Sequence, residues 1–260
     1  MSMELLARAD DFGSAQAAND AILQALSRGT LIHNVSCMAC GTWIAQGAAE
    51  LAAFAGKADL GLHYTLNAEW DSVKWRPCAP KADIPTLLDE TGNFRSSRQA
   101  LGEVSIDLDQ ALQEADAQLD RLTALGLPIT YLDGHMGPED MIPGLADALA
   151  QWCRKKGLLY ARPFYRYAAG QPAFGETYET FSAQVDQWLS QLAPGGRYLY
   201  VMHPARSGPE TMAFTNVRRA PGQVAWEREQ EYRSVIDPAW TSRTAQYSIR
   251  FLRYRDLAEN

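Results

Sequence analysis

The sequence alternates short apolar runs with longer segments of helical periodicity, and this rhythm restricts the folds open to the chain. The runs lie at residues 4–9, 31–38, 59–64, 129–132, 158–161, 197–202 and 247–252. Strands that alternate with helices build parallel sheets through βαβ crossovers. Seven such runs predict a barrel or a wide parallel sheet in the α/β class. The 260 residues fit one barrel, so we expect a single domain over residues 1–260.

Helical segments are recognisable between these runs. Residues 15–27 carry helical periodicity, and Asp107 can cap a second helix with apolar residues at steps of three and four. Pro143 can open a third helix, which ends in three cations before Gly157. The segment 67–105, which follows the third run, fits neither the helix nor the strand pattern. Connections of this length are usually functional or disordered.

The charge balance excludes one class of partner. Lys and Arg total 24 against 31 Asp and Glu, a formal net charge of −7. Binding to a phosphate backbone needs a basic surface, so nucleic acid is not expected as a partner. No stretch approaches the roughly 18 apolar residues of a membrane span, and the first ten residues lack the features of a signal peptide. We therefore expect a cytoplasmic protein, not bound to membranes, whose four cysteines are reduced thiols. The sequence leaves open whether the chain forms a homo-oligomer.

Ionisable side chains gather where the predicted strands end. These positions are Asp10 and Asp11 after the first run, His63 at the end of the third, Asp133 and His135 after the fourth, and His203 after the sixth. They include three of the four histidines in the chain. The carboxyl ends of parallel strands open on one face, so groups far apart in sequence can converge there.

One carboxylate and two imidazoles form a common ligand set for a divalent metal. Asp11, His63 and His135 supply such a set, and Asp133 can hold the ring of His135 by a hydrogen bond. The alternative is that the adjacent aspartates only begin a helix and each histidine is a satisfied polar group. The repeated placement at strand ends favours the metal site. The C-x-x-C at Cys37 has no second pair to complete a zinc site, so we interpret its thiols as buried.

Five motifs in order resemble one known family. They are the segments Ala9–Gly13, Gly61–His63, Ile84–Phe94, Leu132–His135 and His203–Pro204. Together they resemble the YdjC-like (ChbG-type) carbohydrate deacetylases, a family related to the NodB-type polysaccharide deacetylases. The resemblance extends from the first run to residues 254–257. It implies a distorted TIM-like (β/α) barrel with one divalent metal, Zn or Mg, that removes acetyl groups from N-acetylated sugars such as chito-oligosaccharides.

The resemblance also assigns roles to individual residues. Asp11, His63 and His135 match the metal ligands of the family, and Asp10 matches its catalytic base. His203 resembles the histidine that acts as general acid.

Other positions of the site follow from the resemblance less directly. Arg162 is similar to an arginine that steadies the base in the wider superfamily, which makes it a base-orienting or substrate-binding residue. In the long connection, Trp70, Trp75 and Phe94 are candidates to stack on sugar rings or to cover the site. The alternative for these aromatic residues is that they pack the connection onto the barrel. One position departs from the family: Gly137 stands where a second histidine is usual, so that side chain is missing or another loop replaces it.

Two other functions use the same residues. A different metalloenzyme with two histidines and one carboxylate, such as a non-haem iron oxygenase, would need no base at Asp10. A non-catalytic sugar-binding relative would fit the change at Gly137 but would not need Asp10 and His203. A metal-dependent sugar deacetylase accounts for all of these positions.

Overall fold

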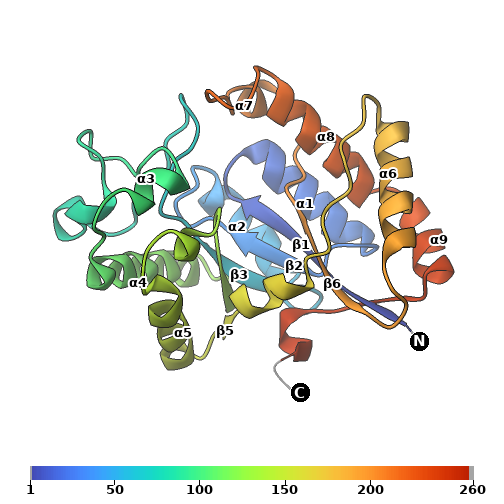
Figure 1. Ribbon diagram of the computed structural model, residues 1–260, viewed down its shortest axis with the longest axis horizontal. Helices are drawn as coiled ribbons and strands as arrows, with labels where there is room; N and C mark the ends of the chain where they lie inside the picture. The colour runs from blue at the N-terminus through green and yellow to red at the C-terminus, as the bar shows by residue number, and fades with distance from the viewer. Residues whose placement is uncertain (1, 258–260) are drawn as a thin grey trace.

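All seven predicted runs form strands of one parallel sheet in the computed structural model, which describes residues 2–257 (Figure 1). The strands are β1 (Met3–Phe12), β2 (Asn34–Cys37), β3 (Asp59–Tyr64), β4 (Ile129–Gly134), β5 (Leu159–Tyr160), β6 (Arg197–Met202) and β7 (Ile249–Phe251). Their order is β5-β4-β3-β2-β1-β6, and β7 also pairs with β1. The α/β prediction with parallel strands is confirmed.

The long strand β1 organises the sheet because it pairs with three neighbours. One edge pairs first with β7, from Met3 to Leu5, and then with β2 from Arg8 onward. The other edge pairs with β6 along six positions. The strand continues to Phe12. Asp10 and Asp11, which were predicted to follow it, therefore lie inside it, directly before its last residue.

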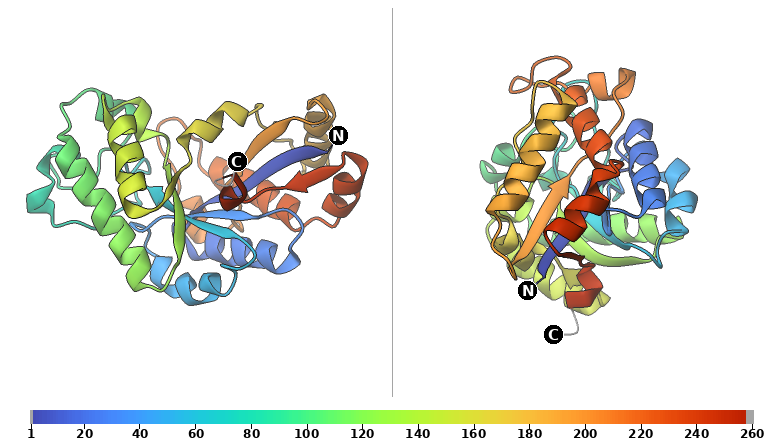
Figure 2. Two further views of the ribbon diagram at one scale, coloured as in Figure 1. Left: turned by 90° about the horizontal axis from the view of Figure 1, so that it is seen from below. Right: turned by 90° about the vertical axis from the view of Figure 1, so that its right-hand side faces the viewer.

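The helices lie around the outside of the curled sheet (Figure 2). They are α1 (Gln16–Arg28), α2 (Ile44–Ala52), α3 (Arg98–Gly102), α4 (Leu108–Ala124), α5 (Leu145–Lys156), α6 (Tyr178–Gln191), α7 (Pro209–Met212), α8 (Gln223–Val235) and α9 (Ala239–Gln246). The three predicted helices are α1, α4 and α5. Asp107 caps α4 through its side chain, as expected. Helix α5 begins two residues after Pro143, because Gly144 takes a left-handed backbone angle (φ 81°) at its N-cap.

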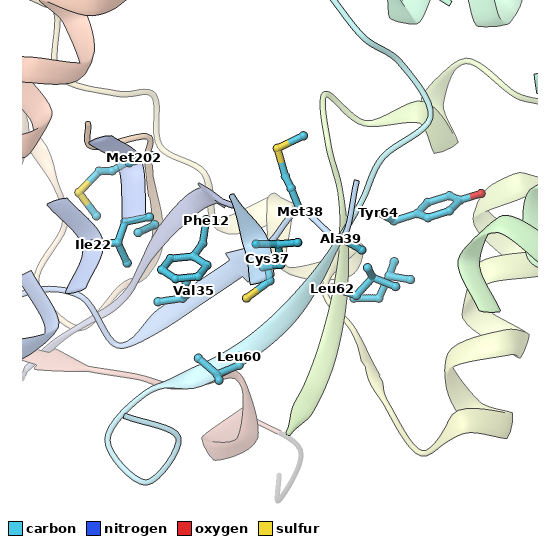
Figure 3. Close-up of a cluster of buried hydrophobic side chains, with 14 of the residues drawn as sticks. Phe12, Ile22, Val35, Cys37, Met38, Ala39, Leu60, Leu62, Tyr64 and Met202 are labelled. Carbon is cyan, nitrogen blue, oxygen red and sulfur yellow. The ribbon is translucent and has the colours of Figure 1, made fainter. Parts of the chain in front are cut away.

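The sheet separates two apolar layers. Alternate residues of a strand face opposite sides, so Leu5 and Ala7 of β1 face the helices whereas Leu6 faces the inside of the curl. The outer layer is the larger one, and Figure 3 shows part of it, with Ile22 of α1 near Val35 of β2. The inner layer is small and combines tyrosine rings with leucine side chains. Polar side chains can therefore enter the curl beside it.

The curl is open between its edge strands β5 and β6, which do not pair within the described residues. A short helix, η4 (Arg162–Tyr167), fills this gap, and the residue after it forms a parallel bridge between Ala168 and Leu199 of β6. The result is the distorted barrel that the family resemblance implies.

The long connection after β3 is folded. It contains the short helices η1 (Lys81–Asp83), η2 (Pro85–Leu87) and α3, and it docks on α4 through hydrogen bonds to Gln110 and Glu114. The remaining short helices are η3 (Pro138–Asp140) and η5 (Tyr254–Leu257). Over residues 2–257, the structure contains no helix with the length and apolar character that a bilayer crossing requires. The cytoplasmic location stays a prediction.

Packing inside the curl predicts a sensitive glycine. A Cβ atom on Gly61 of β3 would come within 2.2 Å of the Tyr131 ring. That ring is fixed by a 2.9 Å hydrogen bond to Ser36 and by contact with Tyr254. We expect Gly61→Ala to lower the free energy of unfolding by about 1–3 kcal/mol, because overpacking shifts neighbouring groups. Urea denaturation measures it.

The matched control is Gly56→Ala, since no atom lies within 4 Å of the added Cβ there. Equal stability of the two variants would contradict this packing of Tyr131.

Candidate active site

A cavity of about 890 Å³ opens at the carboxyl ends of the strands. It is lined by most of the predicted site residues, namely Asp10, Asp11, His63, His135, Arg162, His203 and Trp70. Asp133 lies fully buried beneath them. Parallel strands thus bring together groups nearly two hundred positions apart in the chain.

Three of these side chains aim one atom each at a common point. Oδ1 of Asp11 lies 3.4 Å from Nε2 of His63 and 3.4 Å from Nδ1 of His135, and the two ring nitrogens are 3.1 Å apart. Oδ1 of Asp11 is buried and has no hydrogen-bond partner among the described residues. A buried carboxylate oxygen without a partner is costly. The three atoms could therefore hold a metal ion.

The backbone at Asp11 explains how two adjacent aspartates serve one site. Neighbouring residues of a strand point to opposite faces, and Asp10 already points into the curl together with Arg8. Asp11 has a left-handed backbone angle (φ 64°), and the pairing of β1 with β2 is irregular at this point. Aspartate tolerates this conformation better than most residues. The turn brings its carboxylate back to the cavity.

Each histidine is oriented by a carboxylate on the nitrogen away from the common point. Nδ1 of His63 lies 2.8 Å from Asp133, and Nε2 of His135 lies 3.1 Å from Glu69. The predicted partner of Asp133 was wrong, because strand register places it directly across from His63. Glu69 was not predicted, since it lies in the long connection, where no periodic pattern marks it.

These carboxylates also control protonation. Burial opposes a charge on either ring, yet Asp133 raises the pKa of His63 well above its usual value. Glu69 likewise raises the pKa of His135, to about 9. When a ring carries a single proton, the carboxylate holds it on the nitrogen that faces it, which leaves the opposite nitrogen as the one that can bind a cation.

Asp10 is held by an arginine from its own strand. Nε and one terminal nitrogen of Arg8 donate to the two oxygens of Asp10, at 2.6 and 2.8 Å. Arg8 also donates to the hydroxyls of Tyr165 and Tyr254 and lies 3.2 Å from Asp133. Burial opposes its charge, but these carboxylates raise the pKa of Arg8 further.

Arg162 occupies a different place from the one its base-orienting role requires. It lines the cavity and forms an ion pair with Asp140, which also lies 3.6 Å from Arg98. Its other predicted role, contact with substrate, is compatible with its position at the cavity wall. The sequence did not identify Arg8 as the partner of Asp10, because it is one charged residue within an apolar run.

Helix α8 closes another side of the cavity. Arg228 donates to Oδ2 of Asp11 at 2.6 Å, and Glu231 accepts the backbone N–H of His203 at 2.8 Å. Burial lowers the pKa of His203, and Arg228 adds to this effect. Burial also raises the pKa of Glu231, to about 8. The sequence analysis predicted neither residue of α8.

The three aromatic candidates of the long connection differ in whether they reach the cavity. Trp70 lines the cavity and stacks on Phe214, with ring centroids 5.2 Å apart. Trp75 and Phe94 are each 1% exposed and do not line this cavity, although all three residues belong to the core cluster. The packing alternative therefore holds for these two residues. Gly137 lines the cavity with a left-handed backbone (φ 63°).

Comparison with known proteins decides the family. Residues 4–246 match the model of a family described as YdjC-like protein. The chain belongs to the YdjC-like family. A carbohydrate deacetylase of Geobacillus stearothermophilus is 25% identical over 97% of each chain. A chitooligosaccharide deacetylase of Yersinia pestis (strain Pestoides F) is 28% identical over 61% of this chain and 58% of its own length. The predicted family resemblance is confirmed.

Solved structures share the fold of this YdjC-like chain. A candidate cellobiose-phosphate cleavage protein from Enterococcus faecalis superposes with a TM-score of 0.77 at 18% identity, over 99% of both chains. The catalytic domain of a peptidoglycan N-acetylglucosamine deacetylase from Eubacterium rectale gives a TM-score of 0.53 at 10% identity, over 97% of this chain and 89% of that one. At these identities the likeness shows the distorted barrel alone.

The raised pKa of Glu231 predicts a pH effect on stability. In the unfolded chain this carboxyl loses its proton near its ordinary pKa of 4.5, and in the folded chain near 8. Between these values the folded state binds more protons, so Glu231 makes stability fall as pH rises, by up to about 1.4 kcal/mol per unit. We expect Glu231→Gln to flatten the decline of the urea midpoint between pH 5 and 8.

Glu50→Gln is the matched control, because Glu50 is exposed on α2. A Glu231→Gln variant that declines as steeply as the wild type and this control would contradict the burial of a neutral carboxyl there.

Proposed function

We propose that this YdjC-like protein is a metal-dependent carbohydrate deacetylase that hydrolyses the acetamide group of N-acetylated sugars, including chito-oligosaccharides. One observation carries the proposal: the three converging ligand atoms share a cavity with a restrained carboxylate, Asp10, whose Oδ2 lies 4.0 Å from Nε2 of His63. The deacetylase names of the Geobacillus and Yersinia relatives support the same reaction.

The ligand set favours zinc or a related transition metal over magnesium. Donor atoms about 2.0–2.1 Å from a tetrahedral ion stand roughly 3.3 Å apart. The separations of 3.1 to 3.4 Å among Asp11, His63 and His135 match this value. Magnesium prefers oxygen ligands, whereas two of these three donors are imidazole nitrogens. We therefore propose one ion, held by these three residues.

When bound, such an ion polarises an acyl oxygen and lowers the pKa of a water ligand. Asp10 then accepts the proton of the attacking water. Its two oxygens are engaged by Arg8, but each carboxylate oxygen has a second lone pair, so the group can still act as a base. Asp11 cannot share this role, because Arg228 and the ligand position engage its oxygens.

His203 donates a proton to the departing sugar nitrogen. It lies in the same cavity, and a positioned acid of this kind contributes about 10²–10⁴ in rate. The lowered pKa of His203 makes its charged form a ready proton donor. Trp70 offers a flat apolar surface for a sugar ring at the cavity wall. A base held beside the ligands also distinguishes this site from an oxygenase, which needs none.

Separate substitution of the two adjacent aspartates tests which one is the metal ligand and which one is the base. We expect Asp11→Asn to lose bound metal and activity together. Asp10→Asn should keep the metal and lose at least about 10²-fold in kcat, because only the base is removed. The assay is acetate release from a panel of N-acetylated mono- and oligosaccharides, on metal-stripped protein restored in turn with Zn, Mg, Mn, Co and Ni.

Metal content is measured in parallel on each protein. A metal-stripped wild type with full activity would refute the metal dependence. Full activity in Asp10→Asn would remove this residue from the role of base.

The same conservative substitution, arginine to lysine, tests whether Arg8 or Arg162 orients the base. Lysine keeps the charge but cannot form the two parallel hydrogen bonds of the guanidinium group. We expect Arg8→Lys to lower kcat by about 10- to 100-fold with KM and metal content unchanged, since a slightly misplaced base is costly. Arg162→Lys, the control, should change kcat by less than about threefold. The opposite ranking would assign the orientation of the base, Asp10, to Arg162.

A further inference from the structure

Two cysteines outside the proposed mechanism lie close together. The sulfur of Cys40, in the loop after β2, is 4.0 Å from the sulfur of Cys78, 38 positions further along in the long connection. Both are free thiols. Cys40 is buried, whereas Cys78 is partly exposed. The C-x-x-C spacing of Cys40 with Cys37 therefore does not identify its spatial partner.

The carboxylate of Glu114 on α4 fixes this pair. It accepts the backbone N–H groups of Cys78 and Ala79 at 2.9 and 2.8 Å, and the side-chain amide of Gln118 at 2.8 Å. Its Oε1 lies 3.8 Å from the sulfur of Cys40. Both oxygens are thus engaged, and a structural zinc site needs four ligands. The arrangement suits the joining of two thiols better than the binding of an ion.

We propose that Cys40 and Cys78 are a redox modification site that forms a reversible disulfide by exchange with a low-molecular-weight disulfide such as oxidised glutathione. The sulfurs need to move from 4.0 Å to the bond length of about 2.05 Å. Both residues lie in loops, so no helix or strand contains the backbone that has to move.

The exchange has two balanced steps. The thiolate of Cys78 attacks one sulfur of oxidised glutathione, so that a mixed disulfide forms and one glutathione thiolate leaves. Cys40 then gives its proton to Glu114 and attacks the sulfur of Cys78, which releases the second glutathione thiolate. Two protein thiols are oxidised, one glutathione disulfide is reduced, and the two protons finish on the two glutathione molecules.

The order of attack follows from the surroundings of each sulfur. The S–H of Cys40 beside it lowers the pKa of Cys78, the more exposed thiol. Burial raises the pKa of Cys40, so this thiol reacts only after its partner has been activated. Burial also raises the pKa of Glu114, which lets this carboxylate take up a proton.

The bond would join two segments that adjoin the candidate site. The loop of Cys40 wraps the turn that follows Asp11, through hydrogen bonds from Met38 to Phe12 and from Trp43 to Gly13. The long connection of Cys78 carries Glu69. A disulfide would therefore fix the turn of Asp11 relative to the segment that orients His135.

Thiol trapping and mass spectrometry test the proposal on the purified chain. After equilibration with oxidised glutathione, we expect loss of two alkylatable thiols, a mass lower by about 2 Da and a Cys40–Cys78 cross-linked peptide. Dithiothreitol should reverse all three. Closure of this loop should also raise Tm by at least about 4 °C.

Two single variants examine the mechanism. Cys40→Ser should accumulate a stable glutathione adduct at Cys78, because the second attack is removed. Cys153→Ser, which removes a buried thiol elsewhere, should oxidise like the wild type. A wild-type chain that keeps four free thiols, or that stops at the glutathione adduct, would overturn the proposal. None of these readouts depends on deacetylase activity.

Discussion

The two-pronged bond between Arg8 and Asp10, inside the curled sheet, is the interaction on which the site depends. A buried arginine is tolerated only where its charge is balanced, and here Asp10 and Asp133 balance it. Asp133 in turn holds His63, whose other nitrogen faces Asp11, and Asp11 is paired with Arg228. Positively and negatively charged groups alternate along this series of side chains, from the barrel interior to α8. Removal of Arg8 would leave buried Asp10 without the partner that binds both its oxygens, and would leave His63 as the remaining partner of Asp133.

The backbone of β1 makes this series of paired side chains possible. Strand alternation places Leu6, Arg8 and Asp10 on the inner face, and the left-handed turn at Asp11 adds a fourth inward group out of phase. Such a conformation costs energy in a non-glycine residue and persists when the surroundings fix it. Arg228 and the hydrogen bonds of the loop after β2 fix it here. Backbone strain therefore occurs at one of the proposed metal ligands.

The sequence predicts the strands and the convergence of Asp11, His63 and His135, because both follow from local patterns. Apolar runs mark strands, and parallel strands bring their carboxyl ends to one face. It does not predict partners that depend on register or on distant helices. The pairing of His63 with Asp133 needs the register of β3 on β4. Glu69 and Arg228 come from a long connection and a late helix, where nothing in the pattern marks them. Trp75 and Phe94 resemble ligand-stacking residues in sequence, but burial assigns them to the core.

Gly137 shows how the surroundings of a site limit its chemistry. A side chain at this position would meet the carboxylate of Asp140 at 3.1 Å, next to Arg98. Asp140 is already paired with Arg162, so this wall of the cavity carries a network of fixed charges. Arginine does not release its proton near neutrality, and therefore Arg98 and Arg162 can bind polar substituents but cannot replace a proton-transferring histidine. In the proposed mechanism proton delivery to the leaving nitrogen is assigned to His203, which follows β6 and whose backbone N–H is held by Glu231 of α8.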